Sequence, residues 1–283
     1  MNICFIGGGN MASAMLGGLL RNGTCKPGDI RVVEINEQVR AQMKSQGIEV
    51  FDAIGTEAIK GADVVVLAVK PQVMQGVADQ LGSVLSGRQV VLSIAAGMRL
   101  VDLGGWLGNV YDDEGYVLVR AMPNTPALIG AGMTGLYGFP PELGFPTLDD
   151  AQRRSVEEIM SAIGSFVWIR GEDGMDAVTA VSGSGPAYFF YFIEALEQAG
   201  RELGLPPETA RKLALETALG AAKLAHESPE DPATLRARVT SKNGTTERAL
   251  DNMNDNHVKE HIIAAVKAAA ARAREMGDEL GGA

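Results

Sequence analysis

The turn after the first apolar run of this sequence has the spacing of a phosphate-binding loop. Residues 3–6 predict a buried strand, Gly7-x-Gly9-x-x-Ala12 follows, and apolar residues continue at helical spacing. In a dinucleotide-binding unit, Gly7 allows the tight turn, Gly9 lets the backbone approach a pyrophosphate, and Ala12 lets helix and strand pack closely. The helix start offers free N–H groups and a positive dipole end to phosphates. The alternative is a glycine turn that binds nothing. We favour a cofactor site formed by Gly7, Gly8, Gly9, Asn10 and Met11.

An acidic residue ends the next expected strand, at 30–34. Glu34 stands where a carboxylate would bind the adenosine ribose 2′-hydroxyl of a bound dinucleotide. Ile35 follows it, and no Arg or Lys is immediately beside it to hold a 2′-phosphate. Taken alone, this favours NAD over NADP, although Arg31 or Arg40 could supply a cation in the folded chain. The alternative is a solvated glutamate at a strand end.

Two further turns follow later strands, at the edge where open α/β sheets hold their ligands. One reads Ala68-Val69-Lys70-Pro71-Gln72, and the other reads Met122-Pro123-Asn124-Thr125-Pro126. Prolines stiffen the second turn, which presents short polar side chains. The Lys70 ammonium is suited to a phosphate or carboxylate, and an ordinary surface lysine is the alternative.

A hydroxyl-rich turn lies in the second half of the chain, at 239–247. Its glycine delivers hydroxyl groups to the start of a helix, whose N–H groups attract anions. Ser241, Thr245 and Thr246 would suit a substrate carboxylate. The alternative is simple N-capping by Thr245, with Glu247 favourable in the first turn.

The sequence shows no combination of residues typical of metal-dependent, nucleophilic or acid–base catalysis. His257 and His261 are four residues apart, but no third ligand is evident, so we expect no metal site. We find no Ser/His/Asp set and no paired carboxylates. The chemistry must need little acid–base help, which suits hydride transfer, where a cofactor carries the hard step.

Composition limits the partners and the compartment. The chain has 283 residues and a formal net charge of −10, which argues against nucleic acid as a partner. Two cysteines without metal spacing indicate a reducing compartment. A strand begins within three residues of the start, so we expect no signal peptide, and no apolar run suits a membrane span. We therefore expect a cytoplasmic protein.

Strand and helix signals alternate over the first 170 residues and change afterwards. Strands are expected at 30–34, 63–69, 89–94 and 116–121, with edge strands at 132–138 and 166–169, and a surface loop at 104–115. This pattern predicts a doubly wound, mostly parallel sheet. Helices are expected at 186–203, 206–226, 233–239, 245–254 and 258–280. We therefore predict a dinucleotide-binding α/β domain over 1–171 and an all-α domain over 172–283.

The helix expected from Pro186 is apolar on all sides over residues 188–193. Such a helix needs cover on more than one side, and a helical domain of this size has a limited core. A second subunit is the natural cover. The turn at 181–188 leads into this helix, and its small residues fit either a close helix–helix crossing or a functional role.

Five motifs, in this order and at these separations, resemble the pyrroline-5-carboxylate reductase family over essentially the whole chain. They occupy residues 5–12, 68–72, 120–126, 182–188 and 239–246. Each motif alone is weak, and together they are very specific. The resemblance implies an N-terminal Rossmann domain and a helical C-terminal dimerisation domain that interlocks two subunits. It also implies reduction of 1-pyrroline-5-carboxylate to L-proline, the last step of proline biosynthesis, by a homodimer or a larger homo-oligomer built from dimers.

The same resemblance implies roles for individual residues. Ser241, Gly244 and Thr245 would hold the substrate carboxylate, and the Thr246 hydroxyl would hydrogen-bond the ring nitrogen as the catalytic group. The nicotinamide side would be lined by Ala68, Val69, Lys70, Pro71, Pro123 and Asn124.

The sequence departs from the family pattern at the substrate turn and at the cofactor. The family turn usually reads Ser-Pro-Gly-Gly-Thr-Thr, and here Lys242 and Asn243 replace Pro and Gly. Asn tolerates a left-handed conformation, so the turn can survive. Ile35 and Gly55 replace the usual Arg or Ser and the usual Asn, which weakens the case for tight 2′-phosphate binding. We predict that NADP(H) is the cofactor, that NAD(H) is also accepted, and that the NADPH preference stays below about a hundredfold.

Two other functions remain as alternatives. One is a reductase of another small cyclic imino or keto acid. The other is a non-catalytic nucleotide-sensing protein, against which the hydroxyl-rich turn argues.

Overall fold

Buried apolar runs form the strands of a mostly parallel sheet in the computed structural model, which describes residues 1–87, 89–108 and 115–281. Within these residues the strands are β1 (Ile3–Ile6), β2 (Ile30–Val33), β3 (Glu49–Phe51), β4 (Val64–Leu67), β5 (Val90–Ser93), β6 (Val117–Met122), β7 (Gly132–Gly138) and β8 (Gly164–Trp168). They lie in the order β3-β2-β1-β4-β5-β6-β7-β8, and β6 and β7 form the antiparallel pair. The doubly wound sheet predicted from the sequence is confirmed.

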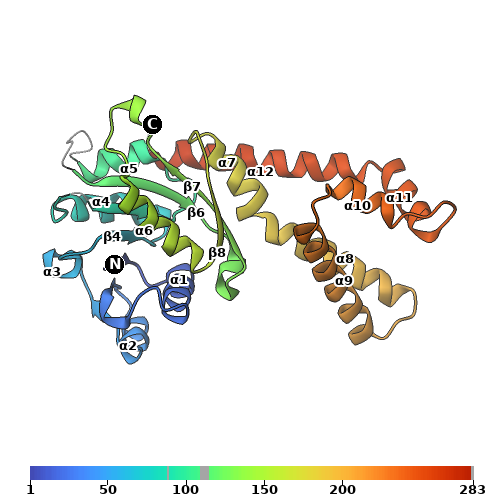
Figure 1. Cartoon of the computed structure of the whole chain (residues 1–283), viewed down its shortest axis with the longest axis horizontal. Helices are drawn as coiled ribbons and strands as arrows, with labels where there is room; N and C mark the ends of the chain where they lie inside the picture. The colour runs from blue at the N-terminus through green and yellow to red at the C-terminus, as the bar shows by residue number, and fades with distance from the viewer. Residues whose placement is uncertain (88, 109–114, 282–283) are drawn as a thin grey trace. The chain divides into compact units, whose positions relative to one another are not determined.

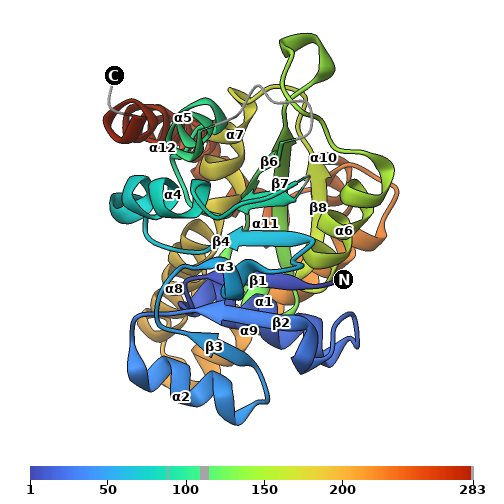
Figure 2. The same ribbon diagram turned by 90° about the vertical axis from the view of Figure 1, so that its left-hand side faces the viewer.

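Helices cover both faces of this sheet (Figures 1 and 2). They are α1 (Asn10–Arg21), α2 (Glu37–Ser45), α3 (Thr56–Ile59), α4 (Met74–Gly82), α5 (Leu100–Leu107), α6 (Asp150–Ser161) and α7 (Gly174–Val178). Alternate residues along a strand enter opposite cores. Phe5 packs in the core that holds α1 and α6, whereas Cys4 and Ile6 pack in the core that holds α4 and α5. Two buried faces explain why the strands are continuously apolar rather than alternating.

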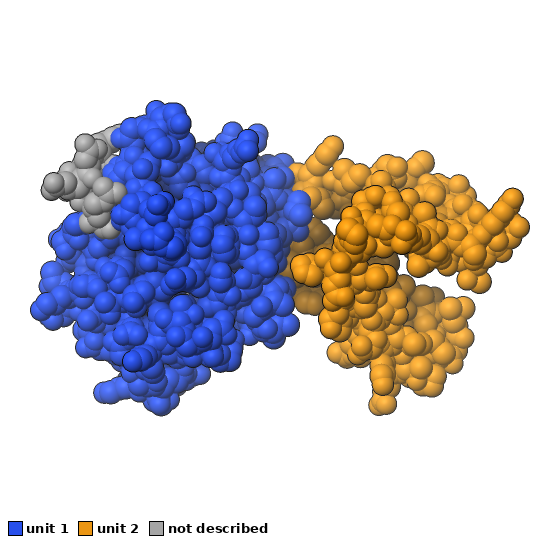
Figure 3. All heavy atoms as spheres, viewed as in Figure 1, with its two compact units in different colours: residues 1–184, 269–283 blue, residues 185–268 orange. Residues whose placement is uncertain are grey.

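The chain divides into two compact units (Figure 3). Unit 1 comprises residues 1–184 and 269–283, and unit 2 comprises residues 185–268. The helices that follow α7 are α8 (Gly185–Glu202), α9 (Pro207–Glu227), α10 (Pro232–Arg238), α11 (Thr245–Asp255) and α12 (Val258–Gly281). These bounds agree with the five predicted helices to within a few residues. The all-α character predicted for the C-terminal region is therefore confirmed.

Unit 1 extends further along the chain than the predicted boundary at residue 171. α7 stays with the sheet because Met175 is fully buried in one of its two cores. The end of α12 also belongs to unit 1, where Leu280 packs against the same core. Helical composition begins near residue 173, but composition does not reveal on which core a helix packs.

Three local features differ from the sequence predictions. The short edge strand β3 was not predicted, because three residues give too little alternation to detect. The expected loop at 104–115 is wrong at its start, since α5 continues to Leu107, and residues 109–114 lie outside the described residues. The first residues of the small-residue turn at 181–188 belong to a π-helical turn at Thr179–Gly183, closed by a hydrogen bond from Ser184 N to Thr179 O (2.8 Å).

Within the described residues, no helix combines the length and the apolar character needed to cross a membrane.

Candidate active site

The glycine turn connects β1 to α1 beside the turn that follows β4. β1 lies between β2 and β4, which is where the winding of the sheet changes direction and where such sheets hold their ligands. Gly7 has a φ of +101°, and a Cβ on it would lie 2.7 Å from the carbonyl oxygen of Ala68. Both facts require glycine at this position, so the predicted role of Gly7 in the turn is explained by its contact with Ala68.

Gly9 borders open space. A Cβ on Gly9 would meet no atom within 4 Å, and no side chain caps α1 at this residue. The first N–H groups of α1 therefore lack side-chain acceptors, and Asn10 beside them is exposed. Ala12 is buried against the sheet, as predicted. This uncapped helix start fits the pyrophosphate of a dinucleotide.

The Glu34 carboxylate lies against the glycine turn. One of its oxygens accepts a hydrogen bond from Gly8 N (2.7 Å), and the other accepts one from Asn36 N (2.8 Å). A Cβ on Gly8 would come within 2.8 Å of the Met43 side chain. Glu34 therefore stands at the expected strand end, and it also ties that strand end to the glycine turn.

The turn after β4 places Lys70 at the surface. Ala68 and Val69 are half-buried, and Pro71 opens a short 3₁₀ turn. The Lys70 ammonium is exposed and makes no hydrogen bond or ion pair with another described residue. The ammonium is therefore available to bind an anion.

The Asn124 side chain is held by neighbours from two other segments. Its Nδ2 donates to the Ser182 carbonyl and hydroxyl oxygens (3.2 Å each), and its Oδ1 accepts from Met133 N (2.9 Å). The Ser182 hydroxyl in turn donates to the Met133 carbonyl (3.3 Å). Close packing accompanies these bonds, because a Cβ on Gly183 would approach the Met122 side chain to 2.5 Å. Asn124 thus joins the turn after β6 to the small-residue motif, a link that no sequence pattern indicated.

The hydroxyl-rich turn adopts the conformation that its sequence requires. Asn243 has a φ of 58°, in the left-handed region, and Gly244 is the N-cap of α11. A Cβ on Gly244 would lie 2.7 Å from the Ser241 hydroxyl oxygen. The Glu247 carboxylate reaches back and accepts a hydrogen bond from Asn243 N (2.6 Å). The expectation that asparagine would preserve the turn is confirmed.

The start of α11 is open. No side chain caps the helix, so the alternative in which the Thr245 hydroxyl serves only as an N-cap is wrong. The hydroxyls of Ser241, Thr245 and Thr246 make no hydrogen bond to any residue in the described part of the chain. Ser241 and Thr245 are exposed, and Thr246 is half-buried. Free N–H groups and unpaired hydroxyls together form a surface suited to a carboxylate.

Thiolate and metal chemistry find no support among the described residues. Burial raises the pKa of the Cys4 thiol to about 12 and also raises the pKa of Cys25, so both remain protonated at neutral pH. The described residues contain no group of three or more His, Cys, Asp or Glu side chains placed to hold a metal ion.

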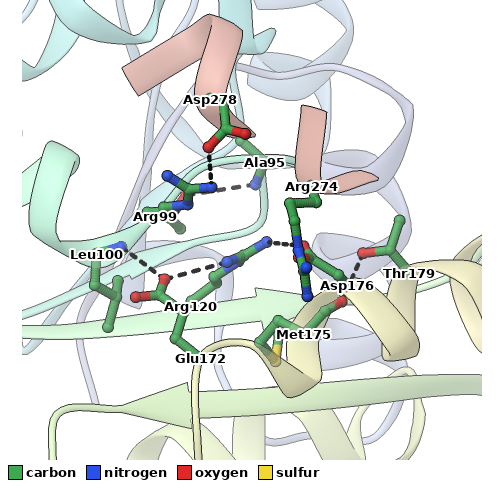
Figure 4. A network of polar contacts seen from close by, with 11 residues as sticks. Ala95, Arg99, Leu100, Arg120, Glu172, Met175, Asp176, Thr179, Arg274 and Asp278 are labelled. Atoms are coloured by element: carbon green, nitrogen blue, oxygen red, sulfur yellow. Dashed lines mark hydrogen bonds and ion pairs between the residues drawn. The ribbon is translucent and has the colours of Figure 1, made fainter. Parts of the chain in front are cut away.

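A buried ion-pair network, also not anticipated from the sequence, supports the turn after β6 (Figure 4). Arg120, in β6, has a side chain that is 4% exposed and lies 3.1 Å from the Glu172 carboxylate. That carboxylate also accepts a hydrogen bond from Leu100 N (2.8 Å). Asp176 lies 3.9 Å from Arg120 and 3.8 Å from Arg274 of α12. The network joins β6, α7 and the end of α12 within unit 1.

The predicted site residues fall into two groups. The cofactor group lies in unit 1, at the carboxyl ends of β1, β2, β4 and β6, and the substrate group lies in unit 2, at the start of α11. The cofactor residues follow strand ends of one sheet, and the substrate residues follow one another along the chain at a single helix start.

Known proteins resemble the chain along its whole length. Residues 172–276 match the family model for pyrroline-5-carboxylate reductase dimerisation, and residues 2–97 match the model for coenzyme F420-dependent NADP oxidoreductases. A pyrroline-5-carboxylate reductase from Pseudomonas aeruginosa is 43% identical over 280 residues, which cover 99% of this chain and 98% of that protein.

Solved structures give the same result. The pyrroline-5-carboxylate reductase of Coxiella burnetii is 39% identical, covers 97% of this chain and 98% of its own, and superposes with a TM-score of 0.88. The pyrroline carboxylate reductase of Plasmodium falciparum, solved with NADP bound, is 27% identical, with 98% coverage of both chains and a TM-score of 0.83.

Proposed function

The chain belongs to the pyrroline-5-carboxylate reductase family, and we propose how its residues divide the work of that reaction. It is an oxidoreductase that reduces 1-pyrroline-5-carboxylate to L-proline with NADPH, in the last step of proline biosynthesis. We expect NADH to be accepted as well.

The cofactor half of the site is assigned to unit 1. When bound, the reduced nicotinamide supplies a hydride. The glycines at 7–9 carry no side chain that would keep the cofactor away from the backbone. The start of α1, with Asn10 and Met11, holds the pyrophosphate. Glu34 lies on the ribose side, while Ala68, Val69, Lys70, Pro71, Pro123 and Asn124 line the nicotinamide side.

The substrate half is assigned to the start of α11. Ser241, Gly244 and Thr245 hold the carboxylate through N–H groups and hydroxyls, and the Thr246 hydroxyl forms a hydrogen bond with the ring nitrogen. Fixing both ends of a small ring restricts the orientations in which its C=N carbon can accept a hydride. A protonated imine is already electrophilic, so the reaction needs no catalytic histidine.

The observation that carries this assignment is the start of α11, which no side chain caps. The hydroxyls of Ser241, Thr245 and Thr246 beside it have no hydrogen-bond partner among the described residues. The test is an assay of the purified protein with pyrroline-5-carboxylate and either NADPH or NADH. Proline should form, and its absence with both cofactors would exclude the reaction. Comparing catalytic efficiencies for five- and six-membered cyclic imino acids would identify a different ring preference.

A Ser241→Ala variant should raise the KM for substrate about threefold to tenfold, with a smaller effect on kcat, because the lost hydrogen bond serves binding. Steady-state kinetics at saturating NADPH measure the split. Thr209→Ala removes an exposed helical hydroxyl of the same unit and should change neither constant. A fall in kcat with unchanged KM would contradict the assignment of Ser241 to carboxylate binding.

The helical region makes the protein a homo-oligomer, and we propose that the unit of assembly is a dimer. In the single chain, Phe189, Phe190 and Tyr191 of α8 are 67%, 66% and 75% exposed, which is unusual for adjacent aromatic residues. Light scattering at micromolar concentration should give at least the dimer mass. A Phe190→Asp variant should associate more weakly, and a monomeric wild-type protein would refute the proposal.

We place the enzyme in the cytoplasm. Both cysteines are free and buried, which suits a reducing compartment.

A further inference from the structure

The guanidinium of Arg40 is fixed across the loop between β2 and α2. Its Nη1 donates hydrogen bonds to the carbonyl oxygens of Glu34 (2.7 Å) and Ile35 (2.8 Å). Its other nitrogens make no hydrogen bond with any residue that the structure describes, and Arg40 is not part of an ion pair there. A planar, permanently charged group with free donors is therefore held at the carboxyl end of β2.

The Glu34 carboxylate is less repulsive toward an anion than its sequence position suggested. Its two oxygens already accept hydrogen bonds from Gly8 N and Asn36 N. The Arg40 guanidinium donates to the backbone carbonyl of the same residue. A carboxylate whose two oxygens both accept hydrogen bonds presents a weakened field to a neighbouring phosphate.

The other arginine of this strand is already engaged. The Arg31 Nε lies 3.0 Å from the Glu49 carboxylate, and its guanidinium also donates to the Lys60 carbonyl. Arg31 occupies the second position of β2, whereas the loop that receives the ribose follows the last. Ile35 itself is 87% exposed and carries no charge.

We propose that Arg40 recognises the 2′-phosphate of NADPH and determines the cofactor preference of this enzyme, an inference that rests on the proposed function. An arginine near the end of the second strand is suited to this phosphate, because its fork donates two parallel hydrogen bonds. Arg40 is positioned by two backbone carbonyls, so little side-chain freedom is lost on binding. Glu34 acts mainly as a clamp between the glycine turn and the loop.

Binding measurements on the full-length protein test the proposal without relying on turnover. Titration calorimetry should show that Arg40→Ala weakens NADPH about tenfold and changes NADH affinity less than about twofold, since only NADPH carries the 2′-phosphate. The Arg40→Ala variant should also bind adenosine 2′,5′-bisphosphate more weakly than the wild type does. Its affinity for adenosine 5′-monophosphate should be unchanged. Arg40→Lys should retain part of the NADPH affinity.

Arg31→Ala is the matched control and should leave both cofactors unchanged, because its charge is paired with Glu49. Equal losses for NADPH and NADH in Arg40→Ala, or no loss for either, would overturn the role of Arg40. These outcomes concern the cofactor alone. A wild-type protein that binds NADPH but forms no proline would instead refute the proposed reaction.

Discussion

A Thr246→Ala variant is expected to turn over about tenfold to a hundredfold more slowly than the wild type, with unchanged affinity for NADPH. The Thr246 hydroxyl is half-buried and has no hydrogen-bond partner within the described residues, so it is free for the substrate. A hydrogen bond to the ring nitrogen contributes roughly 1–3 kcal/mol, which converts to this range of rates. Steady-state kinetics and cofactor titration measure the two quantities.

Thr246→Ser is the control for this prediction, because it keeps the hydroxyl and removes a methyl group. It should retain most of the turnover. Turnover that stays at the wild-type level in Thr246→Ala would remove this hydroxyl from the mechanism. Equal losses in both variants would assign the effect to packing at the start of α11.

An Arg120→Met variant should have a free energy of unfolding about 3–5 kcal/mol lower than that of the wild type, because it leaves the Glu172 carboxylate buried without its cation. The two side chains are 4% and 18% exposed and 3.1 Å apart. Burial raises the pKa of Glu172 even with Arg120 and the Leu100 N–H beside it. Denaturant unfolding at one fixed protein concentration measures the loss.

The pH dependence of this variant has a definite sign. Removing Arg120 raises the folded-state pKa of Glu172 further above its unfolded value. The unpaired charge therefore destabilises the variant at neutral pH, and the loss shrinks as the pH falls through the raised pKa and the carboxyl is protonated. A loss of unfolding free energy that stays the same between about pH 5 and 8 would contradict this explanation.

A second variant separates the ion pair from packing. Arg120→Met combined with Glu172→Gln removes both charges and should recover part of the stability, since Asp176 keeps Arg274 at 3.8 Å. Arg153→Met is the matched surface control, because Arg153 is 47% exposed beside Glu157 and its pair should contribute less than about 1 kcal/mol.

Local sequence determined the elements and the types of residue at the site. Continuous apolar runs predicted the central strands, and helical spacing predicted α8 to α12, because burial on two faces and the 3.6-residue repeat leave direct traces in composition. The glycine turn and the left-handed Asn243 followed from the few residue types that tolerate such backbone. The start of α11 was predicted because a glycine followed by a helical pattern marks a helix start over a few neighbouring residues.

Only the tertiary structure decided which distant groups meet. The hydrogen bonds of Asn124 to Ser182 and Met133 join residues 58 and 9 positions apart, and the Arg120–Glu172 pair spans 52. The sequence also left open whether Arg31 or Arg40 brings a cation to the end of β2. In the structure Arg31 is paired with Glu49, whereas the Arg40 side chain folds back from α2 and donates to the Glu34 carbonyl. Interactions of this kind depend on the packing of whole elements, and packing leaves no periodic pattern in the sequence.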